Sequence, residues 1–240
     1  MLDAPGSRHR RETSYPSADG VDLSPVSQGY LQAIWCAREW HDVGVTTKHL
    51  ADRLGVSCST VSETVRKLTA NGYTVHPRYG SVDLTDAGCT AALQIVRRHR
   101  LLKCFLAREL GYTWDEIDDE AALLAPTISR LMISRMDAKL GFPEHDPHGD
   151  PIPSADGELI ERPATTVLAT MESGHSGAVA RVAADRDMLR YFAQIGIGLG
   201  TVIKVWGRRP SVGTIEVAVA GFGSVHLGVP AAEAISLARN

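Results

Sequence analysis

The chain has 240 residues, of which 44% are hydrophobic and 22% are charged, and its formal net charge is −3 at pH 7. These values are typical of a folded globular protein and exclude a disordered or fibrous chain. Because the balance of charge is slightly acidic, any affinity for nucleic acid has to come from a local basic surface. No apolar run reaches the roughly 20 residues that a membrane span needs, so no membrane contact is expected.

Residues 1–23 are predicted to be a flexible arm, because prolines and glycines interrupt them and they show no hydrophobic periodicity. They also lack the apolar segment of a secretory signal. The four cysteines are far apart and form no CxxC pair, so we expect reduced thiols in a cytoplasmic protein. The basic cluster at 8–11 is interpreted as a solvated tail or as a contact to phosphate.

Residues 24–88 are predicted to form a winged helix-turn-helix domain. Hydroxyl residues that can cap helices precede segments with apolar residues at helical spacing, and Gly55 marks a tight turn. Two short alternating segments, with Pro77 and Gly80 between them, predict the wing. The expected elements are helices that begin after Ser24, at Thr46–Thr47 and after Ser57, and strands at 73–76 and 81–84.

A winged helix reads DNA by placing the second helix of its helix-turn-helix in the major groove. Basic residues outnumber acidic ones between residues 45 and 84, which makes this surface mildly basic. Small hydroxyl side chains can reach base edges, and the cations are placed to contact phosphates. Glu63 is interpreted as a partner for a cytosine amino group or as a solvated carboxylate. The predicted DNA-binding residues are Thr47, Ser57, Ser59, Thr60, Ser62, Glu63, Thr64, Arg66, Lys67 and Arg78.

Residues 89–140 are predicted to form an all-helical dimerisation domain. Their helices are apolar on more than one side, which usually means that a second face is buried, so we expect a homodimer through helices 89–140. The expected elements are a long helix from Thr85 to Leu110, a helix capped by Thr113, opened by Trp114 and interrupted by Pro126, and a helix at about 127–140.

Residues 141–163 contain many prolines and glycines and are predicted to be a linker. From 164 to 240 the pattern changes to about five short alternating strands with one helix at about 186–195, which favours a small β-barrel. The glycine-rich segment 196–200 is interpreted as a helix stop followed by a turn. The predicted fold class is therefore mixed α+β.

An ordered series of segments resembles the diphtheria-toxin-repressor family, whose members are iron- and manganese-dependent regulators. The resemblance covers about residues 24–240 and implies a winged helix, a helical dimerisation domain, an SH3-like barrel, and a homodimer on a palindromic operator. The segments are Thr47-x-x-x-Leu-Ala-x-x-Leu54, Ser57-x-x-Thr60-Val-Ser-x-Thr64-Val, Asn71-Gly72-Tyr, Val82-x-Leu84-Thr-x-x-Gly88, Arg98-His99-Arg-Leu-Leu, Trp114-Asp-Glu-Ile and Pro147-His148-Gly149-Asp150-Pro151-Ile152-Pro153.

The resemblance also implies a divalent metal cofactor, Mn2+ or Fe2+, but most of the corresponding ligand positions are changed. At the first metal site, the residues at the family's ligand positions have no side-chain donor atom. The ligands that the family takes from its barrel correspond to positions near Ala183 and Ala184. At the second site His99 is kept, whereas Lys103 replaces a glutamate and Asp118 replaces a histidine. The first-site positions are Gly29, Ala122, Ala125 and Pro126.

These replacements predict a DNA-binding transcriptional regulator with a lost or altered metal response. The alternative is a conventional Mn2+- or Fe2+-activated repressor with non-standard ligands, for which the weak candidates are His99 with Asp118, and His145 and His148 in the donor-rich loop 144–150. Each of these side chains also has a purely structural interpretation. A protein-binding adaptor is a further alternative, which a neutral or acidic recognition face would favour.

The sequence also allows regulation by signals other than a metal ion. A small organic effector is a hypothesis for the region where the first-site ligands are replaced by small apolar residues. Cys58 is expected on the DNA face, where oxidation could block binding, and Cys104 in the dimer helix; both are also interpreted as plain small residues. No nucleophile, base and orienting group occur together at recognisable spacing, so an enzyme is not expected.

Overall fold

The computed structural model describes residues 23–40, 44–77, 80–161 and 164–238. The predicted arm therefore lies outside the described residues except for its last residue, and so does Arg78. That last residue, Leu23, is buried in the N-terminal core, and its carbonyl oxygen accepts a hydrogen bond from Gln28 Nε2 at 2.9 Å. Leu23, which was assigned to the arm, is thus part of the N-terminal core. No helix among the described residues combines the length and apolarity needed to cross a membrane.

The N-terminal unit is a winged helix, and its helices begin where the hydroxyl residues were predicted to cap them. The side-chain oxygens of Ser24, Thr46 and Ser57 each accept a hydrogen bond from the backbone N–H three residues later, at 3.1–3.2 Å. Gly55, at φ 66°, ends the second helix in the left-handed region, which allows the sharp turn. The elements are α1 (Pro25–Glu39), α2 (Thr47–Leu54), α3 (Cys58–Ala70), β1 (Thr74–Val75) and β2 (Asp83–Leu84).

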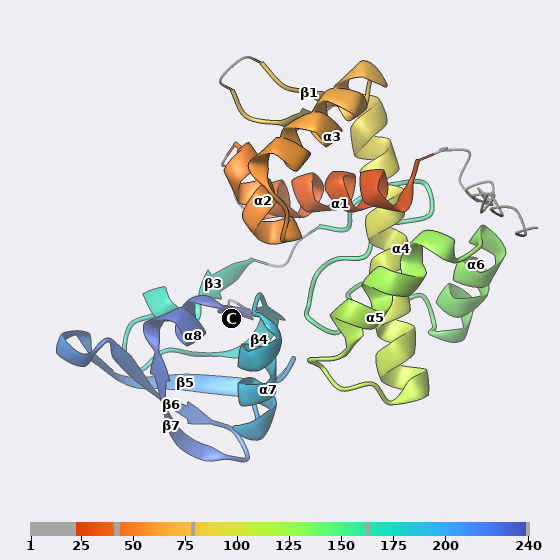
Figure 1. Cartoon of the computed structure of the whole chain (residues 1–240). Coiled ribbons are helices and arrows are strands. Elements are labelled where there is room, and N and C mark those ends of the chain that lie inside the picture. Colours follow the sequence, from red (N-terminus) through yellow and green to blue (C-terminus); the bar gives the residue numbers. More distant parts are fainter. Residues whose placement is uncertain (1–22, 41–43, 78–79, 162–163, 239–240) are drawn as a thin grey trace, which may run out of the picture.

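One long helix, α4 (Asp86–Leu110), joins the winged helix to the helical domain (Figure 1). Its N-terminal half packs into the winged-helix core through Ala91, Ala92 and Ile95. Its C-terminal half packs with α5 (Ile117–Leu124) and α6 (Arg130–Lys139) in a second core. The predicted boundary between residues 88 and 89 thus falls inside α4, which continues through Gly88.

The second helix of the helical domain begins later than predicted. Thr113 does not cap it: its backbone N–H donates to Glu116 Oε2 at 2.9 Å, and α5 starts at Ile117. Trp114 lies before the helix, with its indole N–H donating to the carbonyl oxygen of Pro147 at 2.7 Å. Pro126 ends α5 as predicted, in a short 3-10 turn.

The proline-rich segment 141–163 is not a free spacer over its described part. The Ile152 side chain is fully buried in the core of the helical domain. The segment folds back on itself, with the N–H of Ile152 donating to the carbonyl oxygen of Glu144 at 2.7 Å and the N–H of Asp146 donating to that of Asp150 at 2.9 Å. This segment is therefore packed against the helical domain and contributes to its core.

The C-terminal unit is a small barrel-like sheet beside the helical parts (Figure 1). Its strands are all antiparallel, in the order β3-β8-β4-β5-β6-β7, and enclose a core that includes Leu168 and Phe192. The predicted strands and the helix are present, whereas the last helix and strand were not anticipated. The elements are β3 (Thr165–Val167), β4 (Ser176–Val182), α7 (Arg186–Gln194), β5 (Val202–Arg209), β6 (Thr214–Val219), β7 (Gly223–Gly228), α8 (Val229–Glu233) and β8 (Ile235–Ala238).

Candidate DNA-binding face and metal-site positions

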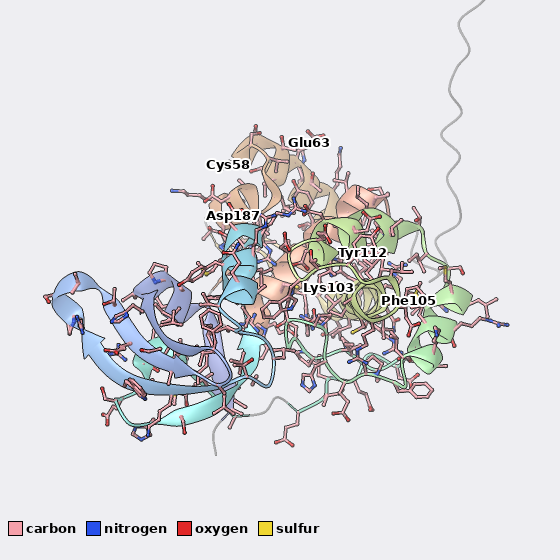
Figure 2. The ribbon with its side chains drawn as sticks, turned by 90° about the horizontal axis from the view of Figure 1, so that it is seen from below. Cys58, Glu63, Lys103, Phe105, Tyr112 and Asp187 are labelled. Carbon is pink, nitrogen blue, oxygen red and sulfur yellow. The ribbon has the colours of Figure 1, made fainter. Side chains whose placement is uncertain are left out.

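The recognition helix α3 has one buried face and one exposed face. Val61, Val65 and Leu68 point into the core and are at most 1% exposed. The predicted DNA-contacting side chains between 57 and 67 lie on the other side; all of them are exposed except Thr64, which is half-buried, as is Thr47 in α2. Cys58 and Glu63 mark the outer edge of the winged helix in Figure 2. The surface expected to enter the major groove is thus open to solvent.

The hydroxyl groups at the start of α3 are tied to the helix itself. Ser57 Oγ, which caps the helix, lies 2.7 Å from Ser59 Oγ and 2.9 Å from Thr60 Oγ1. Ser62 Oγ donates to the carbonyl oxygen of Cys58 at 2.8 Å, and Thr64 Oγ1 donates to that of Thr60 at 3.1 Å. The hydroxyl groups of Ser62 and Thr64 can therefore accept hydrogen bonds from bases as they stand, but have to exchange partners before they can donate to a base.

Two of the predicted DNA-binding residues pair with each other. Lys67 Nζ lies 2.8 Å from Glu63 Oε1, one helical turn away. The hydrogen bond and charge of Lys67 lower the pKa of the Glu63 carboxyl below its usual range. Arg66, by contrast, forms no ion pair with any residue that the structure describes, and it is exposed. Arg66 is therefore the cation of this helix that is best placed to reach a phosphate.

Replacing Arg66 with alanine is expected to weaken binding to all DNA sequences and to lower the salt slope of log K by about one, because one phosphate contact is lost. The measurement is binding to a labelled duplex at several salt concentrations. Lys204→Ala is the matched control, since it removes the same charge from an exposed position on β5. An Arg66→Ala variant with unchanged affinity and salt slope would show that α3 does not dock as described.

The first-site positions line a cavity instead of a ligand cluster. Its volume is about 100 Å³, and an added Cβ at Gly29 would meet nothing within 4 Å. This volume is of the same order as the roughly 150 Å³ cavity that can hold benzene. The hypothesis of a small effector stays a prediction. The lining residues are Pro25, Gln28, Gly29, Gln32, Ile95, Arg98, His99, Ala122, Ala125 and Pro126.

At the second-site positions a lysine occupies the centre. Lys103 is 4% exposed and lies inside the helical domain (Figure 2). Its Nζ is 2.7 Å from Asp146 Oδ2, 2.9 Å from Asp118 Oδ1 and 2.8 Å from His148 Nδ1. We call these four residues the Lys103 cluster. It joins α4, α5 and the loop 144–150.

The charges in the Lys103 cluster support one another. Burial by itself would lower the pKa of Lys103, but the carboxylates of Asp146 and Asp118 outweigh burial and raise this pKa above its usual value. Burial would raise the pKa of Asp146, but the Lys103 ammonium outweighs it and lowers that pKa. Burial and then the charge of Lys103 lower the pKa of His148, which is therefore neutral near pH 7.

The predicted metal candidates are thus only partly brought together. Asp118 and His148 meet around Lys103, but His145 does not join them; its carbonyl oxygen is 3.6 Å from Cys104 Sγ. Within the described ranges, no three His, Cys, Asp or Glu side chains are arranged to hold a metal ion. Since Lys103 Nζ fills the point on which the donors converge, the residues present do not fit a divalent ion.

His99 lies one turn before Lys103 in α4 and is held in its neutral form. Burial, and then the charge of Lys103, lower its pKa from 6.5 to about 4. Unfolding restores the higher pKa, so the unfolded chain binds more protons between these two values. The contribution of His99 to stability is present above pH 6.5 and is lost as the pH falls toward 4.

As the pH falls from 6.5 to about 4, the free energy of unfolding of a His99→Gln variant should therefore decrease less than that of the unchanged protein. The difference in slope is at most about 1.4 kcal/mol per pH unit. Urea unfolding at several pH values across the window measures it. Parallel stability curves for the two proteins would rule out a buried neutral His99.

The sequence did not reveal a set of contacts that holds the barrel against the helical parts. Asp150 Oδ1 accepts hydrogen bonds from Trp40 Nε1 at 3.0 Å and from Arg181 Nε at 2.7 Å. The Arg181 guanidinium also lies 4.1 Å from the centre of the Trp40 ring. Asp150 therefore connects the end of α1 with β4. Two ion pairs from α7, Arg186–Asp119 at 2.9 Å and Arg190–Asp115 at 2.7 Å, add to this contact.

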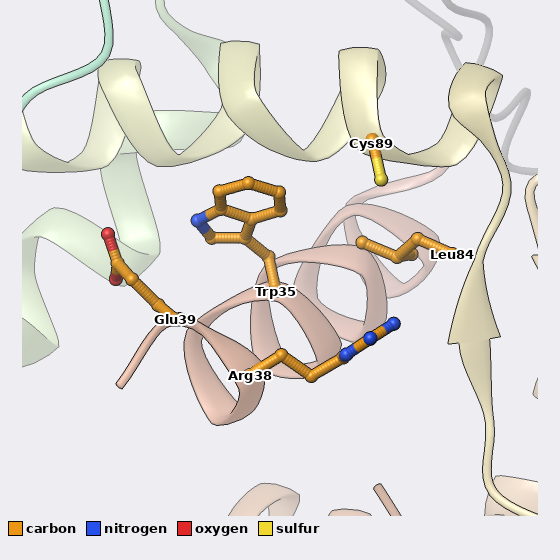
Figure 3. Close-up of a pocket in the computed structure, with 5 residues that line it drawn as sticks. All are labelled: Trp35, Arg38, Glu39, Leu84 and Cys89. Atoms are coloured by element: carbon orange, nitrogen blue, oxygen red, sulfur yellow. The ribbon is translucent and has the colours of Figure 1, made fainter. Parts of the chain in front are cut away.

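A second cavity of about 260 Å³ lies between α1, β2 and α4 (Figure 3). Trp35, Arg38, Glu39, Leu84 and Cys89 line it, and burial raises the pKa of the Cys89 thiol. Burial also raises the pKa of Cys104, to about 12, which makes its thiolate scarce at neutral pH. Oxidation of Cys58, which is exposed on α3, stays a prediction.

A winged helix with an exposed recognition helix, followed by a helical domain and a small barrel, defines a DNA-binding transcriptional regulator. Comparison with protein families agrees over nearly all of the described chain. Residues 22–82 match "Iron dependent repressor, N-terminal DNA binding domain", 85–154 match "Iron dependent repressor, metal binding and dimerisation domain", and 166–239 match "FeoA domain".

A solved structure described as a manganese-dependent transcriptional repressor in complex with manganese is 50% identical, with a TM-score of 0.84 over 89% of this chain and 100% of that chain. The chain therefore belongs to the iron-dependent repressor family, whose members are transcriptional repressors. This confirms the family inferred from the sequence and the SH3-like assignment of the barrel.

Two curated relatives are also similar. The iron-dependent repressor IdeR of Mycobacterium leprae is 31% identical over 134 residues, which is 55% of this chain and 57% of that protein. The diphtheria toxin repressor of Corynebacterium diphtheriae is 31% identical over 137 residues, which is 56% of this chain and 59% of that protein. The chain thus spans less than two thirds of the length of these curated relatives.

Proposed function

We propose that this protein is a sequence-specific DNA-binding regulator that acts as a homodimer on a palindromic operator, and that its DNA binding does not require Mn2+ or Fe2+. The observation that carries the second part is the loss of donors at both sets of ligand positions. The first set offers no side-chain donor, and in the second an ammonium group lies where the remaining donors converge.

The first part of the proposal is that the protein binds double-stranded DNA. Its support is the exposed α3 face, with small hydroxyl side chains at its start and Arg66 free of ion pairs within the described chain. The phosphate contact and the base contacts then come from different parts of one helix. The match to a DNA-binding domain family over residues 22–82 points the same way.

The homodimer is supported by an apolar surface on the helical domain. Leu131 and Met132 are 65% and 48% exposed, and they border a groove of about 360 Å³ that Phe105 and Met136 also line. Large exposed apolar side chains grouped in this way are typical of a protein interface. The same region lies within the match to a dimerisation domain.

The alternative is a repressor that a divalent metal activates through non-standard ligands. The relative at 50% identity is described as a complex with manganese, so this alternative has to be tested. The two functions differ in one measurable respect. A chelator leaves DNA binding unchanged in the first and abolishes it in the second.

The experiment is a selection of binding sites from random duplex DNA with the full-length protein. Parallel arms contain a chelator, Mn2+, Fe2+ or Zn2+. Recovery of the same palindrome in every arm supports the proposal. Recovery only in a metal arm overturns metal independence and assigns the function to the alternative, whereas recovery in no arm contradicts sequence-specific binding itself.

A further inference from the structure

We propose that the Lys103 ammonium is a built-in cation that takes the place of a divalent ion between α4, α5 and the loop 144–150. It holds these three segments together permanently. Removing the ammonium is then expected to convert Asp118, Asp146 and His148 into a site for one divalent cation. This inference concerns metal binding and domain stability, so it does not depend on which DNA sequence the protein binds.

The first support is that the donors and acceptors match in number. A lysine ammonium has three N–H donors and no acceptor. Lys103 Nζ has three acceptor atoms within 2.9 Å, namely Oδ2 of Asp146, Oδ1 of Asp118 and Nδ1 of His148. One hydrogen bond, to His148, and two ion pairs, to Asp118 and Asp146, therefore offset the cost of burying the charge.

The second support is the orientation of His148. Its Nε2 lies 3.2 Å from the carbonyl oxygen of Trp114, and only a protonated Nε2 can form that hydrogen bond. The other ring nitrogen, Nδ1, then presents its lone pair to Lys103. A histidine whose second nitrogen donates to a backbone carbonyl is the usual arrangement of a metal ligand. Here the same arrangement serves an ammonium group.

The third support is that backbone amides hold Asp146 in place independently of Lys103. Its Oδ1 accepts hydrogen bonds from the N–H of His148 at 2.8 Å and from the N–H of Asp150 at 3.0 Å. This leaves Oδ2 pointing toward the ammonium. The Asp146 carboxylate therefore keeps its orientation in a variant that lacks the lysine. Asp118, whose side chain is 46% exposed, can adjust its position.

Charge and distance indicate what such a variant would bind. With neutral His148, the two carboxylates carry two negative charges, of which Lys103 neutralises one and a divalent ion would neutralise both. Metal–ligand distances for nitrogen and oxygen are about 2.0–2.2 Å, so the ligands need to move inward by about 0.5–0.9 Å from their present 2.7–2.9 Å. Imidazole with carboxylates suits Zn2+, Co2+ and Mn2+.

The test compares the full-length protein with Lys103→Ala, after chelator treatment, by thermal unfolding and by titration with Co2+ followed by visible absorption. The unchanged protein is expected to show no shift in Tm and no spectrum. Lys103→Ala should have a lower Tm in chelator, bind one Co2+ per chain with a ligand-field spectrum, and regain stability with Co2+, Zn2+ or Mn2+.

Two further variants identify the site. Lys103→Met keeps the volume of the side chain without its charge, so it should lose stability but bind no metal. Lys103→Ala combined with Asp146→Asn should lose the metal response. If Lys103→Ala is unfolded in chelator, folding on addition of Co2+ is the supporting result. Absence of Co2+ binding by Lys103→Ala overturns the proposal, as does one-to-one binding by the unchanged protein that Asp146→Asn removes.

Discussion

Leu131→Asp is expected to dissociate the homodimer and to lower the affinity for a palindromic operator by about 100-fold or more. Leu131 is 65% exposed at the edge of the groove on α6, so a carboxylate there would replace an apolar contact and lose its hydration against the partner, although Arg135 and Lys139 also line the groove. A dimer binds two half-sites at once, and losing that linkage costs about 10²–10⁴ in affinity without removing any single DNA contact.

Light scattering with size-exclusion chromatography measures the molecular mass, and a binding titration on full and half operators measures the affinity. Val212→Asp is the control, because Val212 is 69% exposed on the barrel, outside the groove. A Leu131→Asp protein that remains a dimer with full affinity would place the interface elsewhere. The affinity for an isolated half-site should be unchanged in both variants.

Gly149→Ala is expected to lower the free energy of unfolding by at least about 3 kcal/mol. Gly149 has φ +88°, and an added Cβ would lie 2.1 Å from the carbonyl oxygen of Ala180 and 2.9 Å from the Cα of Arg181. Both are backbone atoms of β4, so they cannot move aside as a flexible side chain would. The loop 144–150 would have to separate from the barrel, which breaks the hydrogen bond from the N–H of Val182 to the carbonyl oxygen of His148, 2.9 Å long.

Gly141→Ala separates backbone strain from the close approach. Gly141 also has positive φ, +74°, but an added Cβ there meets nothing within 4 Å. Its expected cost is only the roughly 1–2 kcal/mol of a left-handed conformation. Equal losses for the two variants in denaturant unfolding would mean that the loop can leave β4 without further cost.

Local signals predicted the winged helix and most of the barrel. Ser24, Thr46, Ser57 and Thr85 cap their helices as expected, because capping depends on residues only three positions apart. Thr113 does not cap a helix, because its hydroxyl group donates to Asp115 Oδ1 at 2.9 Å and the N–H of Glu116 donates to the Thr113 carbonyl oxygen at 3.0 Å. The final strand β8 was not predicted; its four residues are too few to give a clear periodic pattern.

The Lys103 cluster was predictable only in part. The sequence places Lys103 one turn from His99, at a position where it replaces a glutamate of the family. It could not show that Asp146 and His148, from a proline-rich segment far along the chain, would surround the ammonium. Such contacts depend on how the segment folds back, which composition alone does not encode. The same holds for Asp150, which bonds to both Trp40 and Arg181.

The uninterrupted helix α4 determines the distance and the relative rotation of the two winged helices in a dimer. A helix of 25 residues is about 37 Å long, and it rigidly connects the groove on the helical domain with the domain that contains α3. Inserting one residue between Ile95 and Leu101 would rotate one end against the other by about 100° and turn α3 away from the groove it reads. Seven inserted residues restore the rotation to within about 20° but carry the recognition helices farther from the dimer face. The number of residues in this helix therefore sets the spacing and rotation between the half-sites that a dimer can bind.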